Sequence, residues 1–147
     1  MNARIIALLL SAGLLVGCAT PYRPGNLEKN LTVNLTLEDG SALTRSGAVL
    51  EVLHLDKDCA TDYRGYVNLV QGANTVGITA GQRMLLIVEI RQRSLGSKST
   101  MWRGAALTPK SGANYRIDAT YTDAMFDFRL YEATRGAKRE LPIGDQC

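Results

Sequence analysis

The chain has 147 residues, with 17 Lys and Arg against 14 Asp and Glu, which gives a formal net charge of +3. A positive charge this mild argues against nucleic acid as the main partner. A content of 46% apolar and 21% charged residues is typical of an ordinary globular protein, and the length suits one domain. One His and three Cys are too few for a zinc site, so we expect no metal and no cofactor.

The first 17 residues have the pattern of an export signal. Arg4 supplies a positive charge, residues 5–16 form a nearly unbroken apolar run, and the small Gly17 ends the segment. The run is too short to cross a bilayer, which takes roughly 20 residues, but it has the length of a secretory signal. A buried N-terminal helix is the alternative. The order of charge, apolar run and small residue favours the signal.

The four residues Leu15-Val16-Gly17-Cys18 resemble the lipobox of bacterial lipoproteins. The resemblance implies cleavage before Cys18, a diacylglycerol on its sulfur and a further acyl chain on its new amino group. Several chains hold a protein stably on a membrane, because each buried CH₂ contributes about 0.8 kcal/mol. In Gram-negative lipoproteins an Asp after the Cys favours the inner membrane. Ala19 therefore implies the outer membrane, and we expect a lipid-anchored, periplasm-facing protein.

Once Cys18 carries lipid, Cys59 and Cys147 remain as an even pair in an oxidising compartment. We expect one disulfide between them; two free thiols are the alternative. A bridge that closes so long a loop contributes roughly 4–5 kcal/mol in the chain-entropy model. The chain has no Cys-x-x-Cys motif, so the bridge is expected to be structural rather than redox-active.

The mature chain divides into a tether and a β domain. Residues 18–30 contain Pro21, Pro24 and Gly25 and few apolar residues, so we interpret them as a lipidated tether with a reach of roughly 40 Å. Residues 31–147 alternate between apolar and polar with period two, in short segments separated by turns. The expected parts are thus a signal peptide at 1–17, a tether at 18–30 and a β domain at 31–147.

The alternation predicts an all-β fold. Candidate strands cover residues 31–38, 48–55, 66–70, 75–79, 83–93, 102–107, 115–121, 126–131 and 140–143. Residues 95–99 are interpreted as a polar loop and residues 135–139 as a basic loop. We expect an antiparallel β-sandwich, Ig-like or transthyretin-like, with about seven or eight strands after an N-terminal signal helix. A small closed barrel is the alternative.

The segment from Leu107 to Ile117 contains Pro109, Gly112 and Tyr115. It resembles the Pro-x-x-Gly-x-x-Tyr turn into a strand found in small β-sandwich lipoproteins of Gram-negative bacteria, whose families are largely uncharacterised. Pro109 and Gly112 should turn the chain. We expect the Tyr115 ring in the core, with its hydroxyl bonded back to the turn as in a tyrosine corner.

No catalytic constellation stands out, so we expect a protein that is not an enzyme. His54 lies inside a predicted strand and has no second His to assist it. Asp56, Asp58 and Asp62 surround Cys59, but their spacing does not fit an EF-hand calcium loop, and a solvated acidic turn is the simpler interpretation. The nucleophile elbow Gly-x-Ser-x-Gly is absent from the sequence.

Charge is distributed unevenly along the chain. Residues 83–116 carry seven bases and one acid, whereas residues 38–62 carry six acids and two bases. We expect a patch of Arg91, Arg93, Lys98 and Arg103 that meets an anionic partner. The alternative is two solvated regions that partly neutralise each other. Trp102, which lies between these residues, is expected in the core.

These features together predict an outer-membrane lipoprotein that serves as a non-enzymatic binding or envelope-assembly module. Its expected partners are the membrane, through the N-terminal lipid, and an envelope protein or anionic envelope polymer. Two other functions stay open. Outer-membrane lipoproteins of type VI secretion systems are similar in size, lipobox and sandwich fold. Periplasmic lipoprotein inhibitors of hydrolases such as lysozyme are similar in length and disulfide use.

Overall fold

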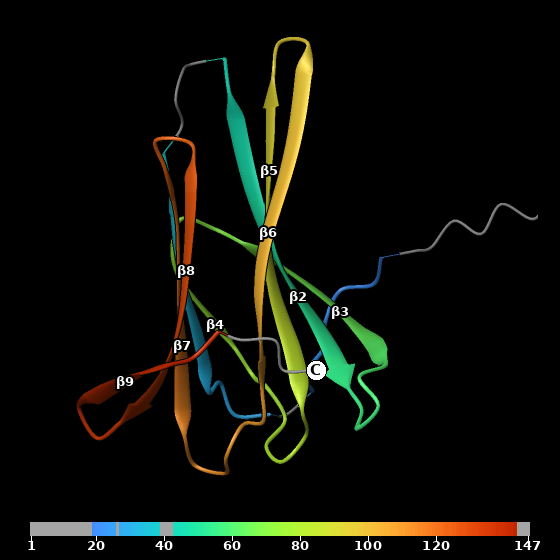
Figure 1. Ribbon diagram of the computed structural model, residues 1–147, viewed down its shortest axis with the longest axis vertical. Helices are drawn as coiled ribbons and strands as arrows, with labels where there is room; N and C mark the ends of the chain where they lie inside the picture. The colour runs from blue at the N-terminus through green and yellow to red at the C-terminus, as the bar shows by residue number, and fades with distance from the viewer. Residues whose placement is uncertain (1–18, 26, 39–42, 144–147) are drawn as a thin grey trace, which may run out of the picture.

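The computed structural model describes residues 19–25, 27–38 and 43–143. Within these ranges nine strands form two sheets that face each other (Figure 1). The strands are β1 (Leu31–Leu37), β2 (Arg45–Leu55), β3 (Thr61–Leu69), β4 (Gly72–Val76), β5 (Met84–Ser94), β6 (Ser97–Leu107), β7 (Asn114–Thr122), β8 (Met125–Thr134) and β9 (Ala137–Leu141). The predicted signal peptide, Cys18 and Cys147 lie outside the described residues.

One sheet has five strands in the order β4-β1-β7-β8-β9, and the other has four in the order β3-β2-β5-β6. Every neighbouring pair is antiparallel except β1 with β7, which run parallel over residues 31–37 and 115–121. The predicted all-β sandwich is therefore confirmed. The parallel pair is a departure from a purely antiparallel arrangement.

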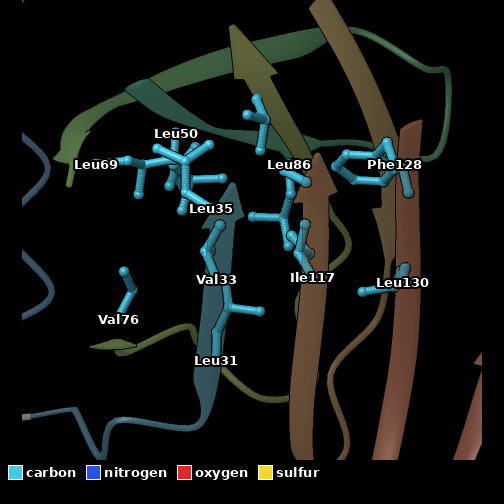
Figure 2. Packing of buried hydrophobic residues seen from close by; sticks show 14 of the residues in the cluster. Leu31, Val33, Leu35, Leu50, Leu69, Val76, Leu86, Ile117, Phe128 and Leu130 are labelled. Carbon is cyan, nitrogen blue, oxygen red and sulfur yellow. The ribbon is translucent and has the colours of Figure 1, made fainter. Parts of the chain in front are cut away.

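Alternating apolar side chains fill the space between the sheets. In β5, Met84, Leu86, Val88 and Ile90 are fully buried, while the residues between them are only half-buried. Across the interface, Leu31, Val33 and Leu35 of β1 are buried in the same alternating way, as Figure 2 shows. Because side chains alternate between the two faces of a strand, this burial fixes which residues each strand presents to solvent.

Two predicted loops are in fact edge strands. The polar loop expected at residues 95–99 shrinks to a turn at Leu95-Gly96, and Ser97 already pairs with Ser94. The basic loop expected at residues 135–139 shrinks to a turn at Arg135-Gly136, and residues 137–141 pair with β8. The prediction was wrong at both places because Ser, Lys and Arg are common on edge strands, where they discourage pairing with another chain.

The turn before β7 has the predicted form. Tyr115 is only 2% exposed, and its hydroxyl accepts a hydrogen bond of 2.9 Å from the backbone N–H of Lys110. Gly112 has a φ of +74°, which permits the turn. The expected tyrosine corner is confirmed.

The prediction that Trp102 lies in the core was wrong. Trp102 pairs with Glu89 on the solvent face of the four-stranded sheet, and 65% of its surface is exposed. It lies on β6, which has only β5 as a neighbour, so no second strand covers its ring.

The segment expected as a tether is partly folded onto the sandwich. Tyr66 in β3 donates its backbone N–H to the carbonyl oxygen of Thr20 at 3.1 Å, and its own carbonyl oxygen accepts the N–H of Tyr22 at 2.8 Å. Further along, Asn30 exchanges two side-chain hydrogen bonds with the backbone of Ile78, at 2.8 and 2.9 Å. The reach of roughly 40 Å estimated for an extended segment therefore does not apply to these docked residues.

Candidate functional site

The basic patch expected from the sequence divides over two faces of the β5–β6 hairpin. Arg91 pairs with Thr100 and Arg93 with Lys98, so Arg91, Arg93 and Lys98 lie on the outer face of the four-stranded sheet. Arg103 pairs with the buried Val88 and therefore projects on the other side of β6. The structure thus brings three of the four predicted residues together and separates the fourth.

Arg91 does not contribute a free charge to this patch. Its Nε donates to a carboxylate oxygen of Glu89, two residues earlier on the same face. This hydrogen bond raises the pKa of Arg91, although burial opposes the shift. The two charges neutralise each other, which leaves Arg93 and Lys98 as the cations of the predicted patch that have no acidic partner among the described residues.

A third cation, missed by the sequence analysis, joins these two. Arg45, at the start of β2, is the direct partner of Arg93, which is in turn the direct partner of Lys98. The three form one row across three strands, called here the basic row. Among the described residues no ion pair includes any of them. Only the strand pairing could have revealed Arg45, because it lies far from the others in sequence.

The basic row has an electrostatic cost that an anion would relieve. Directly opposite side chains in a sheet have Cβ atoms about 4.5–5.5 Å apart, and like charges at such positions destabilise it. All three side chains are exposed, so the charges are open to solvent. Arg presents a planar fork of donors that matches phosphate and carboxylate groups.

The hairpin end beside the row is hollowed and carries an exposed apolar side chain. Arg93, Ser94, Gly96, Ser97 and Lys98 line a cleft of about 590 Å³. Leu95, at the turn, is 82% exposed. Figure 1 shows this hairpin reaching past the end of the five-stranded sheet, which makes it accessible to a large partner.

Cations on the five-stranded sheet are arranged differently. Asp118 accepts hydrogen bonds from Arg116 at 2.6 Å, from Asn34 at 3.1 Å and from Lys138 at 3.1 Å. Burial by itself would raise the pKa of Asp118, but these three donors outweigh it and the net shift is downward. Glu132 similarly accepts from Arg139 and Lys110. These charges are used within the fold, which sets the basic row apart.

A second polar region surrounds His54 at the other end of β2. Arg64 donates to His54 Nδ1 from Nε at 3.1 Å and from Nη2 at 2.7 Å. The same Nε lies 3.3 Å from a carboxylate oxygen of Asp62. Since Nδ1 accepts, the neutral imidazole carries its proton on Nε2. Burial and then the Arg64 charge lower the pKa of His54, while Asp62 acts in the opposite direction.

Two clefts meet at His54 and Gln82. The first, of about 390 Å³, is lined by Arg83 and by the carboxylates Asp56 and Asp62. The second, of about 320 Å³, has Arg23, Arg64 and Tyr22 in its lining and no carboxylate. We call this second space the N-terminal cleft, because residues of the docked N-terminal segment form one wall.

The acidic turn after β2 has a structural role. The Asp56 carboxylate accepts the backbone N–H groups of Asp58 and Ala60, both at 2.8 Å. Cys59, half-buried in this turn, has a φ of +65°. In the part of the chain that the structure describes, no group of three or more His, Cys, Asp or Glu is placed to hold a metal ion.

The described residues also contain no helix long and apolar enough to span a membrane. Comparison with known proteins gives no match, whether to a family model, to a curated protein or to a solved structure.

The environment of His54 leads to a pH prediction. The chain has a single His, so its ring resonances can be assigned directly by NMR in untagged protein. We expect a pKa below the ordinary value of about 6.5, with Arg64→Gln raising it and Asp62→Asn lowering it further. Because the folded pKa is the lower one, the unfolded chain binds the proton more tightly. The contribution of His54 to the free energy of unfolding should be fully present above pH ~6.5 and be lost as the pH falls through the folded pKa.

The control is Arg129→Gln, which removes a cation from the five-stranded sheet, where Arg129 pairs with Asp127. It should leave the His54 titration unchanged. A His54 pKa at or above ~6.5 in the native chain would contradict the predicted downward shift.

Proposed function

We propose that this protein is an outer-membrane lipoprotein, anchored through Cys18, whose sandwich is a non-enzymatic module that binds an anionic component of the envelope. The anchor is supported by the Leu15-Val16-Gly17-Cys18 motif after an export-signal pattern. The single observation that supports the binding activity is the basic row of Arg45, Arg93 and Lys98, which has no acidic partner among the described residues.

The chemistry of the basic row favours a polymer with repeated phosphate or carboxylate groups. Three cations spaced by the strand repeat of about 4.8 Å span roughly 10 Å. An extended anionic chain can meet all three at once, whereas a small anion reaches only one or two. The exposed Leu95 next to the row adds apolar contact area. Catalysis has no part in this proposal.

The proposed structural cross-link is a disulfide between Cys59 and Cys147. Cys59 lies in a turn fixed by the Asp56 carboxylate, so a bond there would tie the C-terminus to a defined point of the four-stranded sheet. The loop it closes is long, which is where the chain-entropy model gives a bridge its largest effect.

The anchor is tested with Cys18→Ser. Serine lacks the thiol that forms the thioether, so the variant should lose the acyl mass and leave the outer-membrane fraction. Ala19→Asp is the control: it keeps the thiol, and the lipobox resemblance implies that the lipidated protein then stays in the inner membrane. Intact-mass measurement and membrane fractionation give both results. An unmodified mass for the native protein would refute the anchor.

The binding activity is tested with the double variant Arg93→Gln/Lys98→Gln. Binding to insoluble cell-wall sacculi, and in a separate arm to lipopolysaccharide vesicles, should fall by about threefold to tenfold, since each exposed ion pair contributes up to about 1 kcal/mol. The melting temperature should stay level or rise, because a repulsive row is removed.

The matched control is Arg129→Gln/Arg139→Gln, which removes the same charge from residues paired with Asp127 and Glu132. It should keep the native binding, and binding of the native protein should weaken with salt. Equal binding by both double variants would show that the basic row is a solvated surface without a binding role.

The cross-link is tested by thiol labelling of unfolded, unreduced protein recovered from the envelope. The native chain should show no labelled thiol, and Cys59→Ala should expose one at Cys147. The same variant should lose several kcal/mol of unfolding free energy, within the range of about 2–5 kcal/mol for removal of a native bridge. Labelling of both Cys59 and Cys147 in the native chain would exclude the bond.

A further inference from the structure

The docked N-terminal segment is held against β3 with little freedom. Besides the two backbone hydrogen bonds to Tyr66, the Tyr22 hydroxyl donates to the carbonyl oxygen of Gly77 at 3.0 Å. Burial raises the pKa of Tyr22, although Arg64 acts against it, so the hydroxyl keeps the proton it donates. Gly65 makes the close approach possible: a Cβ at that position would lie 2.6 Å from the Tyr22 Cα.

This docking fixes where an anchor at Cys18 would hold the domain. Only Ala19 separates Cys18 from Thr20, the first residue bonded to β3. Two residues span at most about 7 Å. With the acyl chains of Cys18 in a bilayer, the β3 edge therefore lies at the level of the lipid headgroups. This step rests on the lipid anchor of the proposed function.

The N-terminal cleft opens beside this edge and has the chemistry to bind a phosphate group. Arg23 directly follows the docked Tyr22 and has no ion pair within residues 19–25, 27–38 and 43–143. Arg64 lies next to Gly65, and its Nε is 3.3 Å from a carboxylate oxygen of Asp62. Its Nε and Nη2 donate to His54, which leaves Nη1 without a hydrogen-bond partner among the described residues. His54, whose Nδ1 is taken by Arg64, has its Nε2–H left as a donor.

The carboxylates of this region line the neighbouring space instead. Asp56 and Asp62 belong to the lining of the first cleft, whereas the N-terminal cleft contains none. The lining of the N-terminal cleft thus contains two guanidinium groups and no carboxylate, although Asp62 reaches Arg64 from the neighbouring cleft. This composition favours an anion over a cation, and guanidinium matches phosphate geometry.

We infer that the N-terminal cleft binds the phosphate of a membrane-lipid headgroup next to the chain's own anchor, through Arg23 and Arg64. The anchor and the cleft then act together: the acyl chains bring the β3 edge to the surface, and the headgroup fixes its orientation there. The lipid that meets this requirement is an anionic phospholipid such as phosphatidylglycerol.

The test uses the full-length, lipidated protein reconstituted in phosphatidylcholine vesicles with and without phosphatidylglycerol. A photo-crosslinking amino acid replaces Gln82, which lines the N-terminal cleft, or in the control Thr100, an exposed residue of β6. Mass spectrometry of the irradiated protein then identifies lipid adducts. We expect adducts with phosphatidylglycerol at position 82 and few or none at position 100.

Charge and docking variants examine the two parts of the inference separately. Arg23→Gln/Arg64→Gln should lower the adduct yield at position 82 by about threefold to tenfold. Arg129→Gln/Arg139→Gln should not change it. Gly65→Ala, which pushes the segment off β3, should also lower the yield, whereas Gly47→Ala has open space around the added methyl group and should not. A thermal melt of each variant verifies that it is folded.

The outcomes separate this inference from the proposed function. A native protein whose intact mass lacks acyl chains overturns the anchor, and this inference with it. An acylated protein without an adduct at position 82, or with equal adducts at positions 82 and 100, overturns the inference alone. Loss of the adduct on addition of inorganic phosphate at millimolar concentration would support recognition through the phosphate group, whereas adducts of equal yield from vesicles without phosphatidylglycerol would overturn the anionic lipid as its source.

Discussion

The burial of every second residue along β5 determines which charged residues of the four-stranded sheet face solvent. Met84, Leu86, Val88 and Ile90 are fully buried between the sheets, so the alternate residues of the same strand must face solvent. A shift of the register by one residue would bury charge and expose the apolar residues, which makes that register strongly preferred. The positions of Arg91 and Arg93 on the outer face therefore follow from core packing. Pairing with β2 and β6 then places Arg45 and Lys98 beside Arg93.

Charges on the two sheets contribute in different ways. On the five-stranded sheet, Asp118 and Glu132 each collect two basic partners, and these contacts link β1, β7, β8 and β9. Lys138 in addition lies 3.7 Å from the centroid of the Tyr131 ring. The basic row of the other sheet has no such compensation, and its members repel one another. A repulsive arrangement on a strongly specified register gives the fold no stability, so we interpret it as a binding surface.

Alternation was enough to predict the inner strands and the class of the fold. The tyrosine corner was also predictable, since Pro109, Gly112 and Tyr115 carry the turn in their spacing. The edges were not. β9 and the first half of β6 consist of polar and charged residues that are equally common in loops, so pattern alone could not assign them. Trp102 was misplaced for a related reason: its size suggests burial, but the exposure of a residue on an edge strand depends on its register and neighbours.

Long-range pairing accounts for the other features that the sequence did not predict. Arg45 joins the basic row only through β2–β5 pairing, and the parallel contact between β1 and β7 joins segments about eighty residues apart. The N-terminal segment contains prolines, which are typical of a linker. Its docking on β3 could not be predicted, because its hydrogen bonds to Tyr66 are made by backbone atoms that any sequence possesses. What is particular to this chain is Gly65 on the receiving side, where a larger residue would collide with Tyr22. That signal becomes interpretable only once the two segments are known to meet.

The strand order of the four-stranded sheet places the proposed lipid contact and the proposed polymer contact toward opposite edges. The N-terminal segment adds to the β3 edge, and β6 is the opposite edge of the same sheet. Three strand spacings of about 4.8 Å separate these edges by roughly 14 Å. If β3 is held at the headgroups by Cys18 and the N-terminal cleft, as proposed, β6 is the strand of this sheet most remote from β3, and Lys98 and the exposed Trp102 lie on that strand. In this proposed arrangement, contact with lipid at the β3 edge leaves Arg93 on β5 and Lys98 on β6 accessible, so a partner could bind there without displacing the domain.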